Sequence, residues 1–185
     1  MFIRKSVFIS FILLSALSAS VAFSAITPTE TADESNPFVQ FLESQYKKII
    51  KVQNDGDLAQ YRLLRSKDIL EKQENRLKAS NETAQFSKYL KETAHFYAAI
   101  EQYHFLKCDT NANIARLSYS KQVPPDAVQE RIEFLIIMFH FEANTWKIGQ
   151  VVTAGQPKFK KDGSPTKLRD VLIDQSIAGK VQLSK

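Results

Sequence analysis

Apolar residues recur every three to four positions between residues 36 and 99, and this spacing predicts three helices. The first begins at Asn36-Pro37, because Asn caps a helix and Pro fits its first turn. Asn54-Asp55-Gly56 ends it, and Asp57 is suited to cap a second helix whose apolar side runs from Leu58 to Leu70. We expect Asn81 to cap the third helix, in which the same spacing continues.

The pattern changes after Ala99, where apolar and polar residues begin to alternate as they do in half-buried strands. The first two strand candidates are 104–107 and 115–120, separated by turn residues at 109–113. The strongest strand is 131–142, and Ala143-Asn144 forms a tight turn to its partner strand at 145–153. Helices followed by an antiparallel sheet predict the α+β class, with N-terminal helices packed against the sheet.

The two-residue turn determines which side chains of this hairpin share a face. It pairs Phe141 with Trp146, Phe139 with Ile148, and Ile137 with Gln150, and so places all of them on one face with Leu135 and Val152. The opposite face carries four large apolar residues, Ile132, Phe134, Ile136 and Met138. Helices can cover the first face. Either the C-terminal tail or a second copy of the chain must cover the other, and we expect a homodimer through this face.

The N-terminus has the layout of a secretory signal peptide: two cations, an apolar run and a group of small residues. The apolar run is too short and too rich in serine for a membrane-spanning helix. We therefore predict a periplasmic or secreted protein with no membrane segment after signal cleavage. The expected divisions are a signal peptide (1–24), a disordered lead (25–36), a cone-like domain (37–155) and a basic tail (156–185) with a short helix at 168–177.

The net charge of +5 does not indicate a nucleic-acid-binding surface. The tail alone carries seven Lys or Arg against three Asp, so the basic excess lies outside the predicted domain, and we expect no nucleic-acid partner. The histidines, His95, His104 and His140, lack the spacing of a metal site and are expected at strand ends or a pocket rim. Cys108, the single cysteine, is interpreted as a buried apolar residue. We accordingly predict no catalytic residue, no metal and no cofactor.

Aromatic residues are the most informative group, with thirteen Phe, six Tyr and one Trp. Rings in such number form ordinary core in most proteins. The sharper hypothesis is a ligand cavity, because ligand sites are mostly apolar with a few placed polar groups. Its predicted lining is Trp146, Phe139 and Phe141, with Gln150, Tyr97 and Tyr103 as orienting polar groups.

Two short motifs and the order of elements resemble the nuclear-transport-factor-2-like superfamily, and in particular its small exported bacterial members of unassigned function. The motifs are Asn54-Asp55-Gly56-Asp57-Leu58 between the first two helices and Thr145-Trp146-Lys147-Ile148 at the start of the late strand. The resemblance covers Pro37 to Ala154 and implies a cone of curved sheet wrapped around helices. The superfamily includes isomerases, dehydratases, hydrolases and binding domains, so no catalytic residue is carried over.

The sequence favours an exported, non-catalytic domain that binds a small apolar ligand or a protein partner. The alternatives are an isomerase or hydratase of the same fold, and a periplasmic lipid carrier. A buried carboxylate facing a His or Tyr inside the cone would favour the enzyme. A deep apolar tunnel would favour the carrier, and a filled cone would favour binding to a protein.

Overall fold

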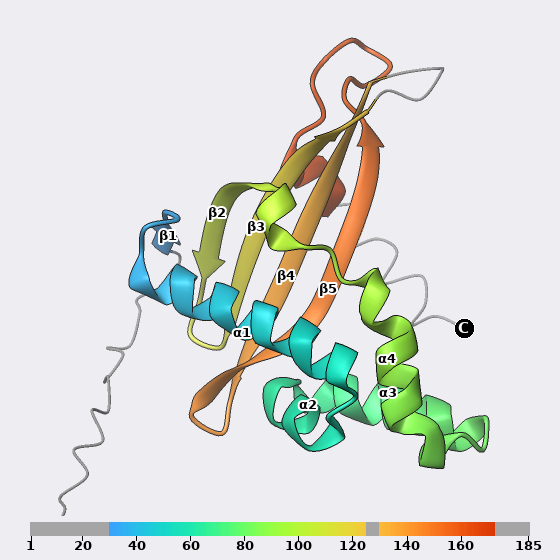
Figure 1. Ribbon diagram of the computed structural model, residues 1–185. Helices are drawn as coiled ribbons and strands as arrows, with labels where there is room; N and C mark the ends of the chain where they lie inside the picture. Colours follow the sequence, from blue (N-terminus) through green and yellow to red (C-terminus); the bar gives the residue numbers. More distant parts are fainter. Residues whose placement is uncertain (1–29, 125–129, 173–185) are drawn as a thin grey trace, which may run out of the picture.

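The structure is a computed structural model that describes residues 30–124 and 130–172, so the predicted signal peptide lies outside it. Helices on one side cover a curved, unclosed antiparallel sheet, which confirms the expected α+β class (Figure 1). The main helices are α1 (Pro37–Asp55), α2 (Leu58–Leu64), α3 (Lys67–Ala79) and α4 (Phe86–Thr93). Short 3₁₀ turns are η1 (Thr83–Gln85), η2 (Ala94–Phe96) and η3 (Ile100–Gln102). The strands lie in chain order as β1 (Glu30–Ala32), β2 (His104–Thr110), β3 (Ile114–Val123), β4 (Arg131–Glu142) and β5 (Thr145–Pro157).

Local capping signals place the first helices as predicted. The Asn36 side chain accepts a hydrogen bond from the Phe38 backbone N–H at 2.9 Å and starts α1. Gly56 ends α1 with a φ of +70°, a left-handed conformation that suits glycine. Asp57 then caps α2 by accepting from the Gln60 backbone N–H at 3.0 Å. The short α1–α2 connection therefore follows directly from its sequence.

Two helix predictions are wrong. The second helix is not continuous to Leu70, because the chain leaves the helical path at Arg65 and Ser66 before α3 begins. There the Ser66 N–H donates to the Ile148 carbonyl at 2.9 Å, so a contact with β5 replaces a helical one. Asn81 does not cap the third helix either. It follows α3 with a φ of +58°, and α4 begins at Phe86.

Strand pairing extends the sheet beyond its predicted ends. β4 and the Ala143-Asn144 turn lie as expected, and both turn residues have positive φ. β2 continues to Thr110 and β5 to Pro157, because their neighbours supply partners that the local sequence does not reveal. Part of the predicted disordered lead forms β1, which pairs with the end of β2. The predicted tail boundary after residue 155 accordingly falls inside β5.

A β-bulge in β5 corrects the predicted register of the hairpin. Phe141 pairs with Trp146 and Phe139 with Ile148, as expected, but Ile137 pairs with Val151 instead of Gln150. One extra residue in β5 reverses its alternation beyond this point. Val151 therefore packs against the helix-side core, Val152 packs on the opposite face, and Gln150 is exposed.

The core lies between the helices and the facing side of the sheet. Tyr46 and Ile49 of α1 are fully buried, as are Leu117, Leu135 and Ile137 on the strands. Large apolar contacts of this kind supply the main free energy of folding. In the part of the chain that the structure covers, no helix is both long and apolar enough to cross a membrane.

The opposite face of β4 is covered within the same chain. Phe134 and Ile136 are each only 2% exposed, and they form a cluster with Val171. Leu168 and Leu172, from the same helical turn at 168–172, pack against this cluster. The predicted homodimer through Ile132, Phe134, Ile136 and Met138 assumed that this face was bare. Part of the tail covers this face, and the homodimer stays a prediction.

Candidate functional site

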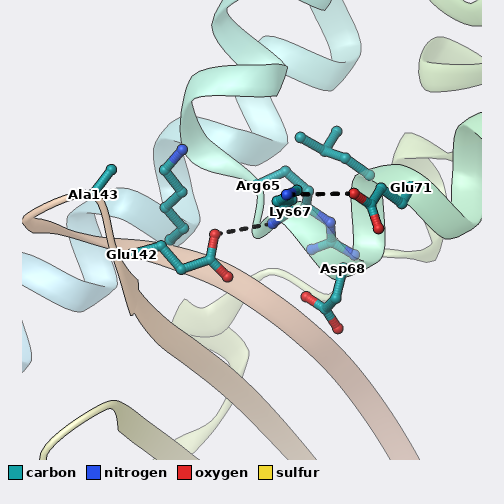
Figure 2. A pocket seen from close by; sticks show the side chains of 8 residues that line it. Arg65, Lys67, Asp68, Glu71, Glu142 and Ala143 are labelled. Carbon is teal, nitrogen blue, oxygen red and sulfur yellow. Dashed lines mark hydrogen bonds and ion pairs between the residues drawn. The ribbon is translucent and has the colours of Figure 1, made fainter.

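A cleft of about 670 Å³ opens between the start of α3 and the tip of the β4–β5 hairpin (Figure 2). We call it the Arg65 cleft. Its volume is within the usual range for small-ligand sites. Six of its eight lining residues are charged, three of each sign, and the complete lining is Arg65, Lys67, Asp68, Leu70, Glu71, Glu142, Ala143 and Lys147. This balance of charge suits a polar ligand better than an apolar one.

Contacts between distant parts of the chain build the cleft. Arg65 forms an isolated parallel bridge with Ile148 of β5. This bridge holds the start of α3 next to β5. The Lys67 backbone N–H then donates to Oε2 of Glu142 at 3.0 Å, which joins α3 to the end of β4 (Figure 2). Because one N–H of the first helical turn has a carboxylate partner, both sides of the cleft are held in place.

Arg65 is a buried charge, with only 5% of the residue exposed. Its Nε and Nη1 atoms have no hydrogen-bond partner among the described residues. The guanidinium carbon lies 6.0 Å from the ring centroid of Tyr61 and 5.9 Å from that of Tyr97. Cation–π attraction to two rings offsets part of the cost of burying the charge. Burial raises the pKa of Tyr61 although the charge of Arg65 opposes this, so the Tyr61 hydroxyl stays protonated at neutral pH.

One imidazole and two carboxylates meet beside the cleft. Nδ1 of His140 lies 3.7 Å from Oδ1 of Asp68 and 3.9 Å from Oε1 of Glu142. Partial burial acts to raise the pKa of Asp68. The Ser66 hydroxyl, which donates to Oδ1 at 2.7 Å, and the nearby His140 outweigh burial and lower it. Asp68 is therefore ionised at neutral pH, and the group carries negative charge.

The six predicted ligand residues do not line this cleft. Phe139 is fully buried in the core, and Gln150 is exposed. Phe141, which is 41% exposed, contacts the half-buried Trp146 with ring centroids 5.2 Å apart. Trp146 also packs edge-on against Phe38.

The two predicted tyrosines lie elsewhere. Tyr97 is half-buried beside Arg65 and Tyr46. Tyr103 is buried, its hydroxyl donates to Glu133, and the Nζ of Lys121 lies 4.4 Å from its ring centroid. A second, smaller cleft of about 170 Å³ contains none of the predicted residues either. It is lined by Asp109, Thr110, Asn111, Ile114, Arg116 and Met138.

Sequence analysis did not identify Arg65, Asp68 or Glu142. One signal was available: His140 and Glu142 alternate on the face opposite Phe141, so the strand pattern alone places them side by side. No local signal connects them to Asp68, which is more than 70 residues earlier in the chain. That contact depends on the Arg65–Ile148 bridge, which only the fold reveals.

The chain was compared with protein-family models, with curated proteins and with solved structures, and none of the three comparisons gives a match.

Proposed function

We propose that this chain is an exported, non-catalytic binding domain that holds a small anionic ligand in the Arg65 cleft. The observation that carries the proposal is Arg65 itself. It lines the cleft, is 95% buried, and has two nitrogen atoms, Nε and Nη1, without hydrogen-bond partners among the described residues. An unpaired buried charge is costly, so a guanidinium in this position is well explained by a ligand that supplies the missing negative charge.

The surroundings of Arg65 support an oxygen anion. Lys67 and Lys147 line the same cleft and add positive charge near its mouth. Tyr61 and Tyr97 pack against the guanidinium and restrict its motion. A planar guanidinium that is already held in position recognises carboxylate or phosphate oxygens at a low entropic cost. The proposal therefore replaces the apolar ligand expected from the sequence with a carboxylate or phosphate.

The change from apolar to anionic ligand follows from where the rings lie. Phe139 is enclosed in the core, and Trp146 packs on Phe38 and Phe141. These rings fill space and do not line either cleft. The arrangement gives the lipid-carrier alternative no support. A fold with helices over a curved sheet agrees with the resemblance to the nuclear-transport-factor-2-like superfamily, which remains part of the proposal.

The enzyme alternative rests on two contacts of a buried tyrosine with a carboxylate, and the first is that of Tyr103 with Glu133, neither of which lines one of the two clefts. The buried Tyr119 hydroxyl donates to Oε1 of Glu43 at 2.7 Å between β3 and α1. A carboxylate facing a tyrosine inside the fold is the arrangement that would favour an acid–base enzyme. Neither residue lines one of the two clefts, so a substrate in those clefts would not reach the pair. We therefore interpret it as a structural hydrogen bond.

The experiment is an NMR titration of the purified protein with acetate, succinate, citrate and inorganic phosphate. We expect saturable shifts of amide signals around Lys67 and Lys147 for at least one of these anions. Arg65→Gln should weaken that binding at least tenfold, because it removes the charge that the ligand neutralises. Arg76→Gln is the matched control, since Arg76 is an exposed arginine of α3. The absence of saturable binding, or equal binding by Arg65→Gln, would overturn the proposal.

A further inference from the structure

The group formed by Asp68, His140 and Glu142 offers three metal-ligand atoms that all lie within 4.8 Å of one another. The donor atoms around a first-row metal with bonds of about 2.0–2.2 Å are separated by roughly 3–3.5 Å. The distances of 3.7 Å and 3.9 Å from Nδ1 of His140 to the two carboxylates are only slightly larger. A cation could thus be bound after a small inward movement of side chains that are already neighbours.

Both carboxylates of the group are held by hydrogen bonds from neighbouring residues. Oδ1 of Asp68 accepts from the Ser66 hydroxyl at 2.7 Å. Oε2 of Glu142 accepts from the Lys67 N–H at 3.0 Å, which leaves Oε1 on the side of His140. Such supporting hydrogen bonds orient ligands in metal sites and contribute to affinity.

Gly149 makes room for the imidazole. A Cβ at this position would lie 2.9 Å from Nε2 and 3.0 Å from Cδ2 of His140, closer than real contacts allow. The ring therefore packs against the Gly149 backbone with its Nε2 edge, while Nδ1 lies near the two carboxylates. This packing selects Nδ1 as the coordinating atom.

The buried charge that carries the proposed function lies in the same region and points to a ligand beside the three side chains. Arg65 lines the same cleft as Asp68 and Glu142, is 95% buried, and has unpartnered Nε and Nη1 atoms in the described part of the chain. Figure 2 shows its guanidinium extending toward the side of the cleft that carries Asp68. Three protein ligands leave further coordination positions open, and an anion in the cleft could occupy one of them.

We propose that Asp68, His140 and Glu142 form a binding site for a divalent first-row metal ion. An imidazole with two carboxylates suits Zn²⁺ or Mn²⁺, whereas Ca²⁺ prefers oxygen ligands alone. Two carboxylates bring negative charge to the site, which a cation balances. The proposal shares the Arg65 observation with the proposed function, and its test measures the binding of the cation alone.

The test is isothermal titration of the chelator-treated protein with Zn²⁺, Mn²⁺ and Ca²⁺. We expect one Zn²⁺ per chain, weaker binding of Mn²⁺, and much weaker binding of Ca²⁺. His140→Gln, Asp68→Asn and Glu142→Gln should each lower the Zn²⁺ affinity at least tenfold. His95→Gln and His104→Gln are matched controls, because both remove an exposed histidine away from the site and should leave the affinity unchanged.

Two further measurements keep the outcome clear if a ligand variant folds poorly. Gly149→Ala retains all three ligands but displaces the imidazole, so it should also weaken Zn²⁺ binding. In the wild type, the imidazole ¹⁵N signals should show coordination of His140 through Nδ1. Zn²⁺ binding that is absent, that survives His140→Gln, or that is lost in the His95 or His104 control would overturn the proposal.

Discussion

The outer face of β4 consists of two halves that differ in chemistry. Its first half carries Phe134 and Ile136, which are covered by the helical turn at 168–172. Its second half carries His140 and Glu142, which lie near the start of α3 and stay partly exposed. Alternation along one strand therefore produces both a sealed apolar cluster and an accessible polar group. On the outer face of β4, a functional site is therefore expected in the half where polar groups are held in place but left uncovered.

The helix side of the same strand offers the sharpest test of this comparison. Phe139 and Phe141 lie two residues apart on one face, yet Phe139 is 0% exposed and Phe141 is 41% exposed. We expect Phe139→Ala to lower the free energy of unfolding by about 3–5 kcal/mol, because it leaves a cavity in the core. Phe141→Ala should cost about 1 kcal/mol, since water already reaches its ring. Urea denaturation measures the free energy of unfolding of both variants. Equal losses of stability would contradict the difference in burial between Phe139 and Phe141.

The cover on the apolar half gives the next largest effect. Val171 is 1% exposed and packs against Phe134 and Ile136. Val171→Ala should therefore lower the free energy of unfolding by about 2 kcal/mol.

Removing residues 167–185 should expose the cluster of Phe134 and Ile136 and cause self-association, which light scattering detects. The wild type should then be a monomer. A wild-type dimer that Phe134→Lys dissociates would instead restore the dimer expected from the sequence.

Local signals made much of the fold predictable. Asn36, Gly56 and Asp57 each determine a helix end through their own backbone or side-chain bonds, and all three lie as expected. The turn at Ala143-Asn144 likewise determines the first two pairs of the hairpin. These features depend on residues that are close to one another in the sequence, which is the range in which sequence patterns carry most information.

Features that depend on distant contacts were not predictable. The break at Arg65 and Ser66 exists because Ile148 provides a partner more than 80 residues later. The bulge in β5 inserts a single residue, and no spacing in the sequence reveals it. The candidate site depends on both, since the first positions Asp68 and the second contains Gly149, against which His140 packs. The site was consequently missed although the fold class was correct.

A smaller effect is expected from the hydrogen bond between Tyr119 and Glu43, which lies in the helix-side core. Tyr119→Phe should lower the free energy of unfolding by about 1–2 kcal/mol, because it leaves a carboxylate without its donor. Burial, followed by Glu43, raises the pKa of Tyr119. Stability from this group is therefore present below the unfolded pKa of about 10 and is lost as the pH rises further. Absorbance at alkaline pH should show the buried tyrosines Tyr46, Tyr61 and Tyr119 ionising only on unfolding, and Tyr119→Phe should lower the size of that signal.

The smallest expected effect concerns an ion pair between the two halves of the outer face. Arg116, which pairs with Met138 across β3 and β4, donates from Nη2 to Oδ2 of Asp109 at 2.6 Å. Lys107 lies 2.9 Å from the same oxygen. Partial burial acts to raise the pKa of Asp109, but the hydrogen bonds and charges of these two cations outweigh it and lower the pKa. A partly exposed pair of this kind contributes at most about 1 kcal/mol.

The sign of the pH dependence of this pair follows from the lowered pKa. The unfolded chain protonates Asp109 near pH 3.9, whereas the folded chain keeps it ionised to lower pH. The contribution of Asp109 is therefore complete above about pH 5 and is lost as the pH falls through the folded pKa. Urea denaturation of the wild type and Asp109→Asn should give a constant difference from pH 7 to 5, and the difference should shrink below about pH 4. Arg116→Met should abolish most of this pH-dependent difference. A difference that is unchanged at pH 3 would show that Asp109 stabilises the fold by its shape and not by its charge.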